Sequence, residues 1–407
     1  MAIVEDFLEH WQVYLSMPVI AAVIGYLTKR AAIEMMFRPL RFVGIREPWL
    51  GWQGVVPRNS ERMIRISADL LTSKLVDTNE IFQRLDPRRV AEEIEGPLLI
   101  AVDEITREVM RRYQPGLWEL MPPLAREMFV KQIQAGSPEL VRRIMAEIQD
   151  DITNVVDIRQ VAVSALTRDK ALLIKLIRDI SRPEMFFIAR CGIYFGLFLG
   201  LIQTVVWAIT KDPWVLPVFG ALIGWFTDWL AIKLVFFPRL PKHFGPVTLH
   251  GVFQRRRDEV AKQYAEIVAR DVMTVPNILD AVLRGPRSDR LLRTIHRIIE
   301  DTIDEQAGIA RPVISVAVGS ETYLEMKHAA ADRAIRYLPD TILHAKDYAA
   351  GALDIRDTIA TRMRRLTRIE YEGLLRPAFR QDEWKLIAVG AVIGAVIGEL
   401  QVLLLLH

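Results

Sequence analysis

The sequence is poor in the residues that build disulfides and metal sites. Its single cysteine, Cys191, lies inside an apolar segment, which excludes an internal disulfide framework and a multi-cysteine metal site. The 7 histidines are scattered, and none falls in an HExxH motif or a paired-ligand spacing. We therefore expect no metal ion and no cofactor.

Enzyme motifs and a strong charge bias are also missing. The chain has no Walker loop, no nucleophile elbow and no GxGxxG motif after a strand, so we expect no enzymatic activity. The net charge of +3 is too weak and too dispersed to indicate a nucleic-acid partner. The first residues, MAIVEDFLEHW, are acidic where a signal peptide needs basic residues. The first apolar segment is therefore expected to stay as an anchor.

Long uncharged runs are scarce as well, because only Cys191–Ile209 is uninterrupted over the thickness of a bilayer. Nevertheless 51% of the residues are hydrophobic and the mean hydropathy is +0.18, which is typical of a membrane protein with a large water-exposed part. The apolar residues concentrate in four segments, Val13–Leu27, Phe186–Ile209, Trp214–Thr227 and Leu386–Leu406. The sequence therefore predicts four transmembrane helices.

The chain also contains an internal duplication. Residues Pro18–Pro39 align with Pro217–Pro238 at an offset of 199, with 10 of 22 positions identical. Further on, Val156–Arg159 matches Leu353–Arg356 at an offset of 197. The sequence therefore predicts one unit written twice, an apolar segment with a charged exit, a polar block and a glycine-rich helix.

The polar blocks show the three-and-four spacing of amphipathic helices. We expect a mainly α integral membrane protein with a tandem (2+2) repeat of spans and two large helical cytoplasmic blocks. Stretches 40–57 and 240–254 are rich in Gly, Pro, Trp and Val and predict a compact loop or a short β-hairpin after each odd-numbered span. The predicted divisions are 1–39, 40–183, 184–238, 239–383 and 384–407, with spans in the first, third and fifth.

Charge predicts the orientation. Basic residues flank the spans on the side of the polar blocks, and Lys211 is alone on the other side. By the positive-inside rule, both blocks are expected to be cytoplasmic and both termini outside. The basic residues on the block side are Lys29, Arg30, Arg38, Arg41, Arg46, Arg178, Arg182, Arg239, Lys242, Arg376, Arg380 and Lys385.

Four stretches resemble landmarks of a known family: GYLTKRAAIEMMFRP, GVVPRNSERM, CGIYFGLFLGLIQ and WKLIAVGAVIGAVIG. They are similar to the YheB/YjiN-type family of uncharacterised bacterial membrane proteins, which carries domain of unknown function 445. The resemblance implies a bacterial cell membrane, a mainly helical cytoplasmic part and no settled activity. Where the family usually has asparagine after Gly-x-x-Thr, this chain has Lys29 and, in the second copy, Asp228.

Two glycine triplets occupy equivalent places in the two halves. Glycines four residues apart give a flat helix face that lets a second helix approach closely. We expect the two triplets to pack against each other at the pseudo-twofold axis. They are Gly192, Gly196 and Gly200 in the first half, and Gly390, Gly394 and Gly398 in the second.

Glu399 is a carboxylate well inside the last predicted span, with Gln401 two residues on and Gln203 at the matching place in the other half. A charged carboxylate in hydrocarbon is costly and is often functional, as a contact for a proton or cation. The alternatives are a neutral carboxyl hydrogen-bonded to a glutamine or a position near the outer interface.

The duplication reverses two charges. Lys29 aligns with Asp228, and Glu34 aligns with Lys233, so facing repeats would bring opposite signs together. The alternative is local pairing four residues apart, Arg30 with Glu34 or Glu34 with Arg38. Short, proline-interrupted segments at matching places are typical of a binding site between transporter repeats.

Two classes of function remain open, and an enzyme without a recognised motif is an outsider. The first is a membrane-anchored helical module that binds a lipid or a protein partner at the cytoplasmic face. The second is a small transporter or channel, an oligomer, with a site at the repeat interface near Glu399. Arg255, Arg256 and Arg257 are expected to contact anionic lipid headgroups rather than nucleic acid. The large polar blocks favour the first class.

Overall fold

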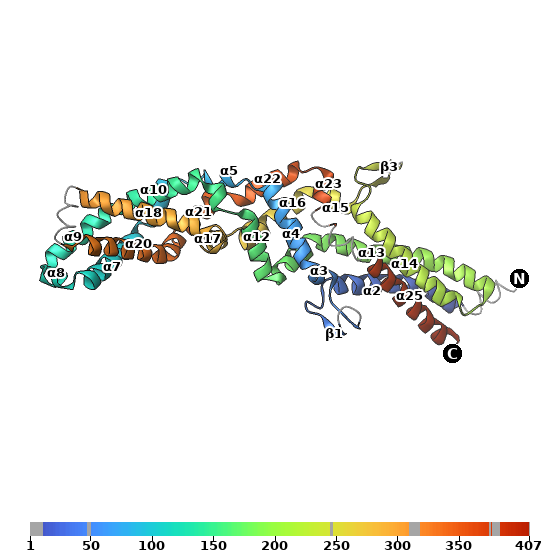
Figure 1. Ribbon diagram of the computed structural model, residues 1–407. Helices are drawn as coiled ribbons and strands as arrows, with labels where there is room; N and C mark the ends of the chain where they lie inside the picture. The colour runs from blue at the N-terminus through green and yellow to red at the C-terminus, as the bar shows by residue number, and fades with distance from the viewer. Residues whose placement is uncertain are drawn as a thin grey trace. The chain divides into compact units, whose positions relative to one another are not determined.

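The computed structural model describes residues 11–46, 50–244, 247–308, 318–373, 376 and 383–406, and these are mainly helical (Figure 1). By their contacts the residues form two units. Unit 1 comprises Met1–Ser67, Leu166–Tyr264 and Ala360–His407, and unit 2 comprises Ala68–Ala165 and Ala265–Ile359. The predicted polar blocks, 40–183 and 239–383, are therefore not separate units, because the central parts of both make up unit 2.

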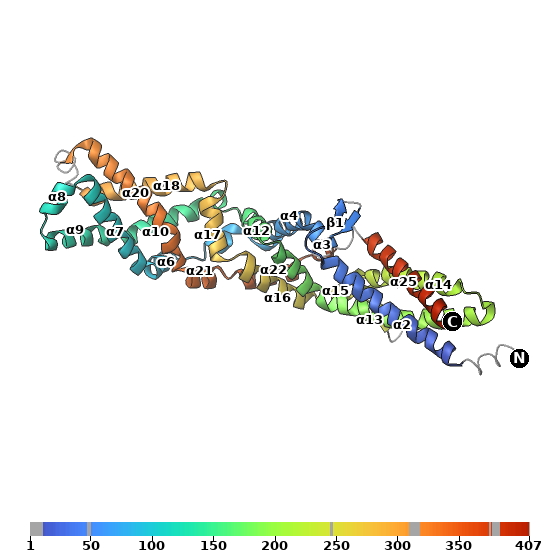
Figure 2. The ribbon, with the colours of Figure 1, turned by 90° about the horizontal axis from the view of Figure 1, so that it is seen from below.

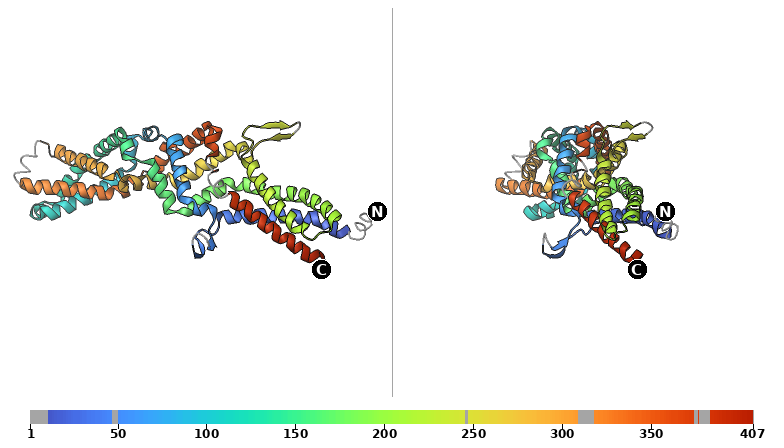
Figure 3. Two further views of the ribbon diagram at one scale, coloured as in Figure 1. Left: turned by 45° about the vertical axis from the view of Figure 1, so that its right-hand side comes forward. Right: turned by 90° about the vertical axis from the view of Figure 1, so that its right-hand side faces the viewer.

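Four long helices dominate unit 1. Within it α2 packs along α13, α14 packs along α25, and α13 also lies against α14 (Figures 1 and 3). Helices α2 and α14 also contact each other, and α2 contacts α25. The four helices are α2 (Trp11–Phe37), α13 (Lys170–Thr210), α14 (Val215–Phe236) and α25 (Glu383–Leu406).

Among the described residues, three helices are long and apolar enough to cross a membrane, Lys170–Thr210, Val215–Phe236 and Glu383–Leu403. The first predicted span lies in α2, which is not one of the three. This helix carries Lys29, Arg30 and Glu34 in its second half. Its membrane crossing, and with it the number of four spans, stays a prediction.

A two-stranded antiparallel hairpin follows α2, and another follows α14, in the two stretches where a loop or hairpin was predicted (Figure 3). In the first, Val43 pairs with Trp52, and in the second Lys242 pairs with Leu249. The indole Nε1 of Trp52 donates a hydrogen bond to the carbonyl of Met35 at 3.3 Å, which ties the first hairpin to α2. The strands are β1 (Val43–Arg46), β2 (Leu50–Trp52), β3 (Lys242–Phe244) and β4 (Val247–Leu249).

Shorter helices complete unit 1, and four of them contain the boundaries between the units. Those four are α4 (Ser60–Leu70), α12 (Ile158–Arg168), α16 (Arg257–Ile267) and α22 (Ile355–Arg365). The others are α3 (Val55–Arg58), α15 (Val252–Arg255) and α23 (Arg368–Glu372). Side chains cap the first turns of several helices. The carboxylate of Asp169 accepts a hydrogen bond from the amide of Ala171 at the start of α13, and Thr367 forms a capping box with Glu370 at the start of α23.

Unit 2 is built from helices of both segments (Figure 2). The first segment contains η1 (Leu71–Leu75), a π-helix, and α5 (Thr78–Phe82), α6 (Pro87–Glu93), α7 (Glu95–Tyr113), α8 (Pro115–Leu120), α9 (Pro123–Ala135), α10 (Ser137–Asp150) and α11 (Ile152–Val155). The second contains η2 (Val268–Val272), also a π-helix, and α17 (Val275–Arg284), α18 (Ser288–Ala307), α20 (Ser320–Leu343) and α21 (Lys346–Leu353).

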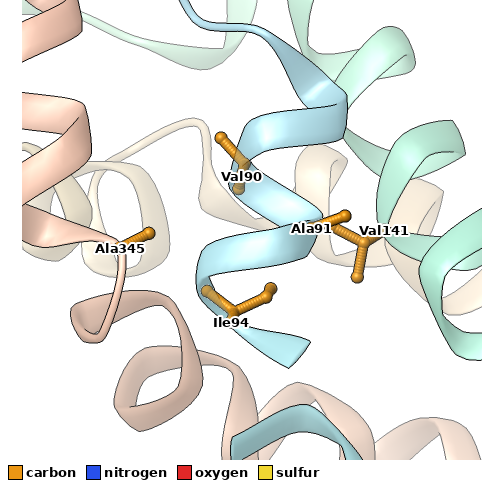
Figure 4. Packing of buried hydrophobic residues seen from close by; sticks show 5 residues of the cluster. All are labelled: Val90, Ala91, Ile94, Val141 and Ala345. Carbon is orange, nitrogen blue, oxygen red and sulfur yellow. The ribbon is translucent and has the colours of Figure 1, made fainter. Parts of the chain in front are cut away.

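The two segments share one apolar core. Val90, Ile94 and Val141 of the first segment are buried in one cluster with Ala345 of the second (Figure 4). Polar contacts cross in the same way, since the guanidinium of Arg84 donates to the carbonyl of Leu353 at 3.1 Å. Unit 2 therefore needs both segments, because each leaves part of this core uncovered.

Candidate functional site

The centre of unit 1 contains a buried ion pair between α2 and α14. The ammonium Nζ of Lys29 lies 2.7 Å from Oδ1 of Asp228, and the two side chains are 0% and 5% exposed. The same ammonium donates a hydrogen bond to Oγ1 of Thr227 at 2.6 Å. The structure thus brings together two of the four charges that the duplication aligns.

Two threonines at equivalent positions lie beside the pair, and each hydroxyl donates a hydrogen bond within its own helix. Oγ1 of Thr28 donates to the carbonyl of Ile24 at 2.8 Å, and Oγ1 of Thr227 donates to the carbonyl of Ile223 at 2.6 Å. Because the Thr227 hydroxyl donates to its own helix, its oxygen is free to accept from Lys29. The ammonium therefore has two acceptors, which lowers the cost of burying it.

Glycines bring the helices into backbone contact beside the pair. A Cβ on Gly25 of α2 would lie 2.2 Å from the carbonyl oxygen of Gly192 on α13, and a Cβ on Gly224 of α14 would lie 2.1 Å from that of Gly390 on α25. Only glycine allows so close an approach. The charged side chains are therefore packed against the backbone of the neighbouring helices rather than against their side chains.

The remaining glycines of the triplets make the same kind of contact. Gly196 and Gly200 approach Ala21 of α2, while Gly394 and Gly398 approach Gly220 and Leu216 of α14. The predicted contact of one triplet with the other is therefore wrong. Each triplet packs against the long helix of its own half, because α2 and α14 also carry small residues at the facing positions.

One oxygen of the pair has no donor. Oδ2 of Asp228 is buried and accepts no hydrogen bond within the described part of the chain. It lies against Gly390, where an added Cβ would be only 1.7 Å away. A buried carboxylate oxygen without a donor is costly, so this oxygen is the polar group at the site that a proton or a small donor could still satisfy.

The predicted intramembrane polar residues divide between two environments. Gln203 and Gln401 are buried, and their amide Nε2 atoms have no hydrogen-bond partner among the described residues. Each lies 11 residues past the first glycine of its triplet, about 16 Å along the helix axis from the level of the charge pair. Glu399, in contrast, is exposed on α25, so it does not face the interior of unit 1.

The second pair of aligned charges is not brought together. Oε1 of Glu34 lies 3.0 Å from Nε of Arg38, four residues on, and Oε2 lies 3.1 Å from Arg178 of α13. The ammonium of Lys233 lies 4.6 Å from the ring centroid of Trp229. The predicted pairing of Glu34 with Lys233 is therefore wrong, and Glu34 has the local partner Arg38 that the alternative expected.

The three consecutive arginines do not form one surface. Arg255 is exposed, but Nη1 of Arg256 lies 2.7 Å from Oε1 of Glu184, and Arg257 donates to the carbonyl of Leu366. The hydrogen bond from Arg256 also lowers the pKa of Glu259. Only Arg255 is thus free to meet a lipid headgroup, because the helical turn points its two neighbours inward.

Several charged groups of the structure were not predicted. In unit 1, Glu184 and Glu372 are each 2% exposed and pair with Arg256 and with Arg239, respectively. Their distance in sequence from these partners leaves no local signal. In unit 2, one ligand atom from each of His296, Glu300 and His328 lies within 4.8 Å of the others. The signal that could have found this group is a histidine followed four residues later by a carboxylate.

Comparison with known proteins gives distant relatives. No family model and no solved structure matches the chain. A UPF0754 membrane protein of Nostoc sp. is 32% identical over 111 residues, which are 25% of this chain and 26% of the relative. One of Microcystis aeruginosa is 29% identical over 129 residues (31% of each chain), and one of Bacillus pumilus is 38% identical over 91 residues (21% and 24%).

The aligned stretches therefore span about a quarter to a third of these curated relatives. The names of the relatives indicate a membrane protein and no activity. Together with the three candidate spans, the similarity shows that the chain is a membrane protein with distant, partial homology to the UPF0754 membrane proteins.

Proposed function

We propose that the chain is a membrane-anchored helical module, in which unit 1 is the anchor and unit 2 binds a protein partner at the cytoplasmic face. The observation that carries the proposal is an exposed apolar surface in unit 2, far in sequence from the candidate spans. We call it the α8–α9 patch. It consists of Leu117, Leu120, Leu124, Met128 and Phe129, which are 45%, 84%, 70%, 65% and 36% exposed.

The helices that carry the patch also contribute to a buried apolar cluster. Trp118, Val130 and Met110 are buried in this cluster, and Arg126 holds the turn between the two helices by donating to the carbonyls of Met121 and Glu119, both at 2.9 Å. Several large apolar side chains left exposed within 13 residues of chain are typical of an interaction site. Adaptable leucine and methionine side chains suit an apolar face of a partner protein.

Charge around the patch favours a protein over an anionic membrane. On α9, Lys131 forms an ion pair with Glu127 at 3.1 Å, so this basic group is neutralised locally, while Arg126 is held by backbone carbonyls. Adsorption to anionic lipid needs a cluster of unpaired basic residues. Membrane lipids remain the partners of unit 1, where Arg255 is the exposed member of the arginine run.

Site-specific photo-crosslinking in cells tests the proposal. A photoreactive residue at Leu120 or Leu124 is expected to give a discrete protein adduct, whereas the same residue at Glu147, exposed on α10, gives none. A lipid adduct at Leu120 or Leu124 would show that the patch contacts a membrane surface and would reject the protein partner. Equal adducts at all three positions would reject the patch as a binding surface.

The second candidate function is a small transporter or channel. It is favoured by buried polar atoms that have no hydrogen-bond partner in the described part of the chain, Oδ2 of Asp228 and the amide nitrogens of Gln203 and Gln401, which could line a polar route in an oligomer. Purified protein in liposomes separates the two candidates. The module predicts no ion or proton flux above that of empty vesicles, while flux that is abolished in Asp228→Asn would favour the transporter.

The anchor is proposed to cross the membrane four times as a tandem repeat. Three features support this: hairpins after α2 and after α14, π-helices at residues 71–75 and 268–272, and the equivalent threonines Thr28 and Thr227. The charge distribution supports cytoplasmic polar blocks and outer termini. The landmark stretches support membership of the YheB/YjiN-type family in a bacterial cell membrane.

A further inference from the structure

A second cluster of titratable side chains lies in unit 2, between α18 and α20, which pack side by side (Figure 2). On α18, His296 is followed four residues later by Glu300, and on α20 His328 is followed four residues later by Asp332. Residues four apart share one face of a helix. The two helices therefore bring two imidazoles and two carboxylates to one seam.

The ligand atoms of this cluster converge on one oxygen. Nδ1 of His296 lies 3.5 Å from Oε1 of Glu300, and Nδ1 of His328 approaches the same oxygen from the other helix. That oxygen is buried, so two ring nitrogens from two helices share one carboxylate oxygen away from water. A cation held jointly by the oxygen and the two imidazoles would satisfy all three ligand atoms at once.

We propose that His296, Glu300 and His328 bind one divalent transition-metal ion of the zinc class, with water completing the coordination. Tetrahedral bonds of about 2.0–2.2 Å place neighbouring ligand atoms about 3.3 Å apart. The 3.5 Å between Nδ1 of His296 and Oε1 of Glu300 fits this spacing, and Nδ1 of His328, which lies closer to that oxygen, would move away from it on binding. Two imidazoles with one carboxylate suit zinc, whereas magnesium and calcium prefer oxygen ligands alone.

The surroundings of the cluster support the assignment. Oδ1 of Asp332 lies 3.4 Å from Nε2 of His296, the ring nitrogen that a metal on Nδ1 leaves free. A carboxylate at that position orients a metal-binding imidazole and fixes its tautomer, so Asp332 is a positioning residue. The nearby ammonium of Lys327 lies 3.2 Å from Asp304, which offsets its repulsion of a bound cation.

The site also has an entrance. The side chain of His328 is 58% exposed, whereas that of Glu300 is 17% exposed. Water and a hydrated ion can therefore reach the ligands from the side of α20. A bound ion would join α18 to α20 and so stabilise unit 2, a role that does not depend on what the α8–α9 patch binds.

Titration of the metal-free full chain in detergent with Zn²⁺ tests the proposal, with binding measured by calorimetry and by competition with a chromophoric chelator. We expect one Zn²⁺ per chain and a higher unfolding temperature of the loaded protein. His328→Ala and Glu300→Gln should each weaken binding at least about tenfold, and Asp332→Asn by about tenfold. Substituted Co²⁺ should show the visible absorption of a nitrogen- and oxygen-ligated site.

His344→Ala is the matched control, because His344 lies at the end of the same helix and its Nδ1 contacts the carbonyl of Asp340 instead. It should bind Zn²⁺ like the unchanged chain. Glu300→Gln keeps the size of the side chain, so it reports on binding even if another variant unfolds. Absence of a one-to-one Zn²⁺ site, or equal loss of binding in His344→Ala, would overturn the assignment.

Discussion

The buried ion pair of Lys29 and Asp228 depends on both of its members. Lys29 is fully buried, yet its ammonium has two acceptors, Oδ1 of Asp228 and Oγ1 of Thr227. Removing one charge of such a pair leaves the other buried without compensation, whereas removing both does not. The ion pair therefore fixes α2 against α14, and substitutions of its two members should be energetically coupled.

Asp228→Asn should destabilise the protein by about 3 kcal/mol, since it leaves the Lys29 ammonium uncompensated while keeping the size of the side chain against Gly390. Adding Lys29→Met should recover most of that loss. Asp228→Lys should likewise reduce folded protein in the membrane, with Lys29→Asp restoring part of it. Thermal unfolding in detergent and the amount of monodisperse protein are the measurements.

The control for this pair is Glu34→Gln, which breaks the half-exposed ion pairs with Arg38 and with Arg178. It should cost under about 1 kcal/mol. If the losses in the free energy of unfolding of Lys29→Met and Asp228→Asn simply add in the double variant, the two charges act independently and do not stabilise the protein as a pair.

Two buried tyrosines predict how stability depends on alkaline pH. Burial raises the pKa of Tyr371 and of Tyr264, and the Tyr371 ring stacks on Phe253 with centroids 4.4 Å apart. A raised folded-state pKa means that stability is fully present below about pH 10 and is lost as the unfolded chain releases its protons above it. The unfolding temperature should therefore fall steeply from about pH 10 upward.

Tyr371→Phe keeps the stacked ring but removes the hydroxyl, which donates to the carbonyl of Phe253 at 3.1 Å. It should lower stability by about 1 kcal/mol at neutral pH and flatten the alkaline loss. The part that remains belongs to Tyr264. An alkaline profile as steep as that of the unchanged chain would show that Tyr371 does not titrate on unfolding.

At the scale of the helix, the sequence predicted the elements better than their partners. The apolar segments, the hairpin regions and the glycines of the packing faces can be read from composition and spacing. Which helix each glycine face meets could not, because α2 and α14 offer small residues such as Gly25 and Gly220 as readily as the triplets do. Glu399 shows a related limit, because spacing gives its depth along α25 and not the side that it faces, and its role stays a prediction.

For sites as well, the sequence reveals residues that share a register but not residues that only packing brings together. The alignment of Lys29 with Asp228 was visible because the duplication puts both in register. The cluster of His296, Glu300 and His328 was missed because its members come from two helices, and no local spacing says that these helices pack together.

Glycines at the helix contacts should not tolerate a methyl group. In Gly224→Ala the new Cβ would lie 2.1 Å from the carbonyl oxygen of Gly390, so α14 and α25 must separate and lose packing. We expect a loss of roughly 2–3 kcal/mol, measured as a lower unfolding temperature. Gly351→Ala on α21 is the control, because nothing lies within 4 Å of its Cβ. It should be neutral or stabilise by up to about 1 kcal/mol.

For the whole molecule the decisive measurement is topology. A reporter that is active only outside the cytoplasm should show activity when fused after His407 and none when inserted between α8 and α9, after Met121. The basic residues that flank the predicted spans at the ends joined to the polar blocks are the physical reason. Activity at the α8–α9 position would reverse the orientation and with it the cytoplasmic location of the partner.

The shared core of unit 2 also has a consequence for synthesis on the ribosome. Val141 is made 204 residues before Ala345, which joins it in the same cluster. At about 5–20 residues per second, this leaves the apolar faces of the first segment uncovered for about 10–40 s. The candidate spans α13 and α14 are synthesised during this interval. The early half of unit 2 is therefore expected to depend on chaperones until its late half emerges.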